Sequence, residues 1–255
     1  MDEDHQTLNG YTIQKRRRKA LMEYPDEDNA TSRWVNVSYV QVKKGNKVLA
    51  KFDANVYFGL GNSTSFGFFP FLGGNSQQLF ISQDIPRGGC QWIVSLAPTF
   101  KIIFDGQKYG VGRQSSDLSA VDLDNDGVFE ITAPITDFYE LQDKLPISRI
   151  PLPLVIFKYD AETRKYLPAN PLFENYVQQE VDALPNINTL DEFDQRASIL
   201  EQLLTYIYAA KEDVGWKFYE KTYKLNDKDE IRRRVKTILR NQPVYKFIYN
   251  HNSHK

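Results

Sequence analysis

Four acidic side chains lie in one short stretch, and their spacing suits the binding of a hard cation. Asp122, Asp124 and Asp126 alternate with other residues, Gly127 follows, and Glu130 stands at the ninth position. Carboxylates this close repel one another unless a positive charge neutralises them, and calcium prefers oxygen ligands of this kind. The glycine lets the chain turn sharply, so that the side chains can converge. The stretch predicts an oxygen-ligand loop that holds Ca2+; the alternative interpretation is a solvated acidic turn without an ion.

The spacing separates this loop from an EF-hand. An EF-hand loop places its bidentate Glu at position 12 and is flanked by helices. Counted from Asp122, the residue at that position is Ala133, and the flanking residues have the pattern of strands. The loop is therefore expected between two strands.

The loop resembles the Asp-x-Asp-x-Asp-Gly-x-x-Asp/Glu pattern of FG-GAP and VCBS-type repeats, found in integrin-like propeller blades and in many bacterial surface proteins. The resemblance implies a structural calcium ion held by the side chains of Asp122, Asp124, Asp126 and Glu130 and by the backbone carbonyl of Val128. It also implies an uncharacterised bacterial protein that is extracytoplasmic, either periplasmic or secreted, with one such loop and a helical tail. Because the chain carries one loop rather than several, we expect no closed multi-bladed propeller.

Catalytic signals are weaker than the metal signal. The three histidines, His5, His251 and His254, lie near the chain ends, where order is least expected, which argues against a histidine triad or a histidine metal site in the core. The His-Glu-x-x-His and Gly-x-Ser-x-Gly signatures are absent from the sequence. A carboxylate pair that includes Asp137 or Glu140, just after the loop, remains the alternative basis for a glycan-directed hydrolase.

Composition indicates a folded globular protein and disfavours some partners. Of 255 residues, 41% are hydrophobic and 25% are charged, and the net charge is -1, so no global field favours nucleic acid or an anionic membrane. No apolar run is long enough for a membrane helix, and the first residues show no signal-peptide pattern. A single cysteine, Cys90, excludes an internal disulfide and is expected to be a small packed core residue.

Three regions differ in their patterns. Residues 1–33 are polar, with a basic run at 15–19 followed by acidic residues, and are expected to form a solvated arm or short helix; a nucleic-acid or anionic-surface patch is the alternative. Residues 34–170 alternate short β-branched and aromatic runs with turns, which predicts antiparallel sheets in a sandwich, a partial propeller or a barrel. The glycines between 59 and 74 are interpreted as tight turns, since no phosphate-loop ending follows them.

Residues 171–255 change to a helical period, which makes the expected fold class α+β: an antiparallel β-rich domain followed by a small helical region. Thr189 is the expected N-cap of a first helix, a second carries Trp216 and its neighbours, and a third spans 227–241. The many aromatic residues of this region predict that part of it docks on the β domain.

Two classes of function follow from these observations. The first is a calcium-stabilised extracytoplasmic binding or interaction protein whose partner is an unknown protein or glycan. The second is the hydrolase described above. Saturable binding without turnover in a ligand screen would favour the first class.

Overall fold

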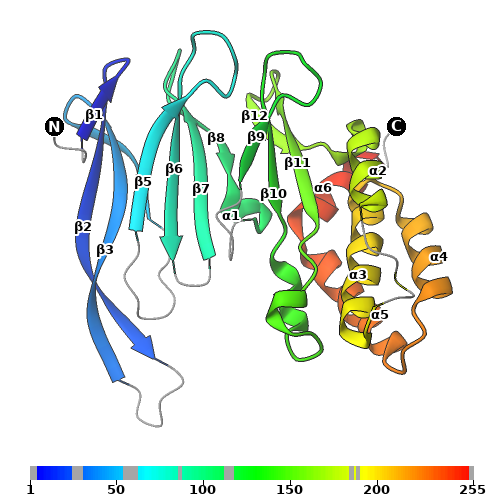
Figure 1. The fold of residues 1–255 in the computed structure, drawn as a ribbon. Helices are drawn as coiled ribbons and strands as arrows, with labels where there is room; N and C mark the ends of the chain where they lie inside the picture. The colour runs from blue at the N-terminus through cyan, green and yellow to red at the C-terminus, as the bar shows by residue number, and fades with distance from the viewer. Residues whose placement is uncertain are drawn as a thin grey trace.

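The computed structural model describes residues 5–24, 31–53, 63–85, 88–111, 118–183, 187 and 190–252. In these residues three antiparallel sheets of four strands follow one another along the molecule, and helices pack beyond the third sheet (Figure 1). The predicted α+β class, with antiparallel strands first and helices last, is confirmed. Thr189, His254 and the glycines at 59 and 61 lie outside the described residues.

The first sheet has the strand order β1-β2-β3-β4. Its strands are β1 (His5–Leu8), β2 (Tyr11–Tyr24), β3 (Thr31–Lys44) and β4 (Lys47–Phe52). β2 and β3 pair along their whole length, and their distal half extends past the shorter strands as a two-stranded ribbon (Figure 1).

This pairing corrects the expectation for the first region, because residues 5–8, 11–24 and 31–33 form strands rather than a solvated arm or a short helix. Tyr11 and Ile13 are buried in the core, whereas the basic residues 16–19 are exposed on the ribbon. The predicted boundary at residue 33 falls inside β3. A strand whose two faces are both solvated has no alternation of polar and apolar residues, so its pattern in the sequence is that of a polar segment.

The second sheet has the order β5-β6-β7-β8 and buries both of its faces. Along β7, Trp92 and Val94 face the first sheet while Ile93, between them, faces the third sheet and the helices. Along β6, Leu79 and Phe80 divide in the same way. The sheet comprises β5 (Ser63–Phe69), β6 (Gln78–Ile85), β7 (Gly88–Ser95) and β8 (Lys101–Asp105), followed by the short helix α1 (Gly106–Tyr109).

The third sheet, in the order β12-β11-β10-β9, carries the acidic loop. Its strands are β9 (Ser119–Val121), β10 (Glu130–Pro134), β11 (Leu154–Asp160) and β12 (Lys165–Pro168). Three 3-10 helices lie between and after these strands: η1 (Asp137–Leu141), η2 (Ile147–Arg149) and η3 (Asn170–Leu172).

The helical region shares one hydrophobic core with the third sheet and with one face of the second sheet. Buried residues of β10 and β11, such as Ile131 and Phe157, belong to the same cluster as Leu203, Tyr219 and Val235 of the helices. The predicted docking of the tail is therefore confirmed. The helices are α2 (Glu174–Asp182), α3 (Glu192–Tyr208), α4 (Glu212–Thr222), α5 (Lys228–Asn241) and α6 (Pro243–Asn252).

Local sequence explains where these helices begin and end. The Asp191 side chain caps α3 by accepting a hydrogen bond from the Asp194 N–H, two residues after the N-cap that was predicted. α5 carries Asp229 and Glu230 in its first turn and Arg240 in its last, charges that favour the two ends of the helix dipole.

Candidate metal centre

The acidic loop, residues 122–130, connects the antiparallel strands β9 and β10. Val121 and Glu130 are paired across these strands, so they close the base of the loop. Asn125 and Gly127 have left-handed backbone angles, with φ of 59° and 83°. These two positions give the tight curvature that turns successive carboxylates inward, and Asn and Gly are the residues that adopt this conformation most readily.

Backbone amides hold the carboxylates in place. Asp122 accepts hydrogen bonds from the N–H groups of Asp126 and Gly127, each at 3.1 Å. The N–H of Val128 donates to Asp126 Oδ1 at 2.8 Å, and the N–H of Leu123 donates to an oxygen of Glu130 at 2.9 Å. The loop is thus preorganised by its own main chain.

A lysine from the neighbouring strand reaches the centre of the loop. The Lys158 ammonium lies 2.6 Å from Asp124 Oδ2, 2.9 Å from Asp126 Oδ2 and 3.2 Å from Glu130 Oε1. Lys158 lies on β11, one step beyond the cross-strand pair of Ile131 and Phe157, and so faces Glu130 directly. Three donors of one ammonium therefore serve three carboxylates.

Burial differs among these charges. The Glu130 side chain is fully buried, Lys158 is 26% exposed, and Asp124 and Asp126 are 39% and 45% exposed. The hydrogen bond from Lys158 is the largest cause of a lowered pKa at Asp126, and the N–H of Val128 adds to it. Burial lowers the pKa of Lys158, but its bonds to the three carboxylates outweigh burial and raise the pKa above the ordinary value.

Residues outside the loop also hold it in position. The Phe129 N–H donates to the Phe71 carbonyl at 2.9 Å, and the Tyr166 hydroxyl donates to the Phe129 carbonyl at 3.0 Å. Gly73 lies so close that a Cβ atom there would be 2.0 Å from the Gly127 carbonyl oxygen. Only glycine fits at position 73 without moving the loop.

The donor set fits a hard divalent cation. One carboxylate oxygen from each of Asp122, Asp124 and Glu130 lies within 4.8 Å of the others, and Asp126 meets Asp124 and Glu130 at the Lys158 ammonium. All side-chain donors are carboxylate oxygens, as calcium prefers. Four carboxylates against one ammonium leave an excess of negative charge, which a divalent ion would reduce further than lysine does.

The structure brings together the four predicted acidic residues of the loop. It adds a basic residue, Lys158, which the sequence did not predict. Val128 lies in the loop, where its N–H contacts Asp126. Lys158 was missed because a single lysine in a strand has no motif, and only the strand register places it opposite Glu130.

The other residues considered for chemistry lie elsewhere. Asp137 and Glu140 lie on η1, where the main chain of Glu140 is bonded by Arg234 of α5. Cys90 is buried in the core between the first two sheets, as predicted, and its sulfur accepts a hydrogen bond from Gln107. His5 lies in the N-terminal strand β1, far in sequence from the loop.

No family model, curated protein or solved structure matches the chain. Among the described residues, no helix has both the length and the apolar character that a membrane crossing requires.

Proposed function

We propose that the acidic loop is a structural calcium site and that the protein is a calcium-stabilised, extracytoplasmic binding or interaction protein. The observation that carries the proposal is the convergence of Asp124, Asp126 and Glu130 on one cationic point, with Asp122 beside them. This arrangement exists around Lys158, and a calcium ion would use the same oxygens. A bound ion would stabilise the connection between β9 and β10 and relieve the repulsion between the carboxylates.

Lys158 and calcium would compete for the loop, because a calcium ion would need the oxygens of Asp124, Asp126 and Glu130 that the ammonium contacts. The lysine side chain is long and partly exposed, so its ammonium can withdraw into solvent when an ion binds. The charge that replaces it is twice as large, which favours the exchange where calcium is plentiful.

This competition supports an extracytoplasmic setting. An ion that must displace a tethered ammonium is bound more weakly than one that enters an open site, and extracellular calcium modules work at about 10⁻⁴–10⁻³ M. The expected affinity therefore suits a compartment with abundant calcium. The partner would be a protein or a glycan, recognised without turnover.

Lys158 also supports a second candidate, a loop that its own lysine closes without any metal. In that case the loop is a salt-bridge network, and calcium has no effect. The hydrolase that would use Asp137 or Glu140 stays a prediction from the sequence.

Calorimetric titration of the metal-free protein with calcium separates these candidates. We expect saturable binding of one ion per chain, lost in Asp124→Asn and unchanged in Asp160→Asn, an aspartate of the same sheet that bonds Thr163 instead. A flat titration of the folded wild-type protein would leave the lysine-closed loop as the better account.

The binding class is tested separately, by screening glycans and proteins with and without calcium. Saturable binding that chelation weakens, with no product formed, is the expected result. Turnover of a glycan would establish the hydrolase instead.

A further inference from the structure

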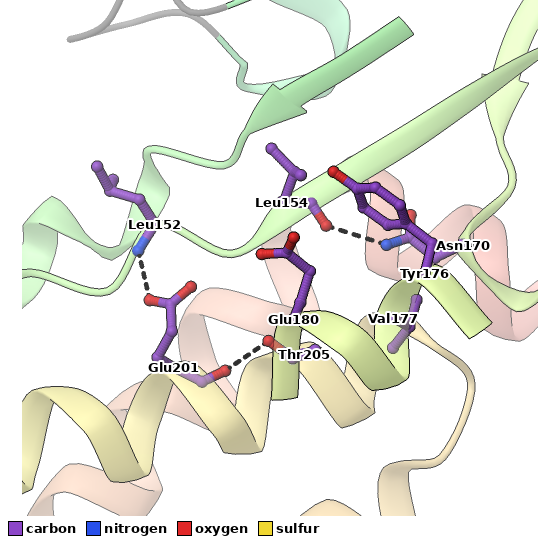
Figure 2. A pocket seen from close by; sticks show the side chains of 8 residues that line it. All are labelled: Leu152, Leu154, Asn170, Tyr176, Val177, Glu180, Glu201 and Thr205. Atoms are coloured by element: carbon purple, nitrogen blue, oxygen red, sulfur yellow. Dashed lines mark hydrogen bonds between the residues drawn. The ribbon is translucent and has the colours of Figure 1, made fainter. Parts of the chain in front are cut away.

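A second acidic site, away from the acidic loop, lies where the helices meet the third sheet. A pocket of about 210 Å³ opens between the start of β11, the helix η3, the helix α2 and the second half of α3 (Figure 2). A cavity of about 150 Å³ is large enough for benzene, so this pocket can hold a small organic molecule. Its lining residues are Leu152, Leu154, Asn170, Tyr176, Val177, Glu180, Glu201 and Thr205.

Glu201 is the most constrained acid of this pocket. One of its carboxylate oxygens accepts a hydrogen bond from the Leu152 N–H at 2.8 Å. The other oxygen is turned away from Leu152, on the side of Glu180 (Figure 2), and no described residue donates a hydrogen bond to it. Burial raises the pKa of Glu201 to about 7, the Leu152 bond opposes this, and the charge of Glu180 adds to it. A carboxylate in this position gains from a cationic partner.

The remaining lining sets the chemistry of that partner. Two acids and no basic residue line the pocket, so its potential is negative. Asn170 is already committed, since its amide bonds the Ile156 N–H and the Leu154 carbonyl. Leu152, Leu154 and Val177 form an apolar wall.

An inorganic ion fits this lining poorly. Calcium takes about 6–8 oxygen ligands, and the apolar wall supplies none. A molecule that combines one ammonium group with a short apolar body matches both parts of the pocket.

We propose that this pocket binds a small organic cation, a primary amine whose ammonium lies between Glu180 and Glu201 and whose apolar body lies against Leu154 and Val177. The amine donates to the outward oxygen of Glu201 and to Glu180, which approaches from α2. The helical region thereby has a ligand site of its own. This site is independent of calcium in the acidic loop.

The test uses the full chain with benzylamine as the probe and benzyl alcohol as its uncharged counterpart. Binding is followed by two-dimensional amide NMR, which reports the position of the probe as well as its affinity. We expect saturable shifts of Leu152, Val177 and Thr205 with benzylamine, and at least about tenfold weaker binding of benzyl alcohol, because a charge-assisted hydrogen bond is lost.

Amide variants of single acidic residues test which charges benzylamine binding depends on. Glu201→Gln removes the charge but keeps an oxygen that can accept the Leu152 N–H, so the position of Leu152 in the pocket should not change. This variant should weaken benzylamine binding about tenfold or more, and so should Glu180→Gln. Asp182→Asn removes the same charge from α2 outside the pocket and should leave binding unchanged.

Absence of saturable shifts, equal binding of the amine and the alcohol, or equal loss in all three variants would each overturn the proposal. Because the titrations are run with chelator present, failure here leaves the calcium proposal untouched.

Discussion

The Lys158 ammonium lies 3.2 Å from Glu130 Oε1, directly across strands β11 and β10. Glu130 is fully buried, and its other oxygen accepts the Leu123 N–H at the far side of the loop. This pair joins the acidic loop to the rest of the third sheet. In this structure the lysine is the counter-charge of the loop.

Lys158→Met should destabilise the calcium-free protein by about 1–3 kcal/mol. The substitution leaves buried Glu130 without a cationic partner and leaves Asp124 and Asp126 in mutual repulsion, although their exposure moderates the cost. Urea unfolding in chelator measures the loss. Lys165→Met, an exposed lysine of the neighbouring strand, is the matched control and should change little.

The same substitution should strengthen calcium binding, by about tenfold, because the competing ammonium is gone. Calorimetric titrations of wild type and Lys158→Met at equal ionic strength measure the ratio of the two dissociation constants. Equal affinities in the two proteins would show that the ion and the lysine do not share oxygens.

Gly73→Ala should be far more damaging than Gly74→Ala. Both glycines have a positive φ, of 72° and 59°, so an alanine is strained at either position, by about 1–2 kcal/mol. Only at Gly73 does the added Cβ also meet the Gly127 carbonyl of the acidic loop, whereas space is open at Gly74. We expect Gly73→Ala to cost about 1–3 kcal/mol more, measured as the difference in unfolding free energy. Similar losses in the two variants would argue against tight packing behind the loop.

Glu201→Gln should stabilise the protein at pH 8 but not at pH 5. The pKa of Glu201 is raised to about 7, mainly by burial, so the folded state holds a proton that the unfolded state releases above about pH 4.5. Folding stability due to this group therefore falls as pH rises from about 4.5 to 7. The loss at pH 8 is at most about 3–4 kcal/mol, and glutamine avoids it.

Urea unfolding of both proteins at the two pH values tests this sign. A stabilising effect that was the same at pH 5 and pH 8 would mean that Glu201 does not titrate in this range.

Sequence patterns predicted the elements that have a clear period. The helical period of the last region predicted α3, and the acids of the loop were correctly expected between two strands. The aromatic surplus of the last region correctly predicted docking, because apolar area of that size must be buried somewhere.

Elements without such a period were missed. β5 lies in a stretch of Gly, Ser and Phe that has the composition of turns, and only its pairing with β6 gives it a strand conformation. In β2, residues 16–19 are basic and exposed, so this part of the strand lacks the alternation of polar and apolar residues by which a strand is recognised. Lys158 and the Glu201 pocket depend on register and on helix docking, which are tertiary properties that local spacing does not encode.

The most direct test of the account is the melting temperature of the wild-type protein in chelator, in millimolar magnesium and in millimolar calcium. An ion that binds only the folded state adds about 2.7 kcal/mol at a hundred times its dissociation constant, and each kcal/mol is worth about 2–4 °C for a chain of this size. We therefore predict a rise of several degrees in calcium, less in magnesium, and no response in Asp124→Ala. Superimposable melting curves in all three solutions would contradict the calcium site and leave Lys158 as the only cation of the loop.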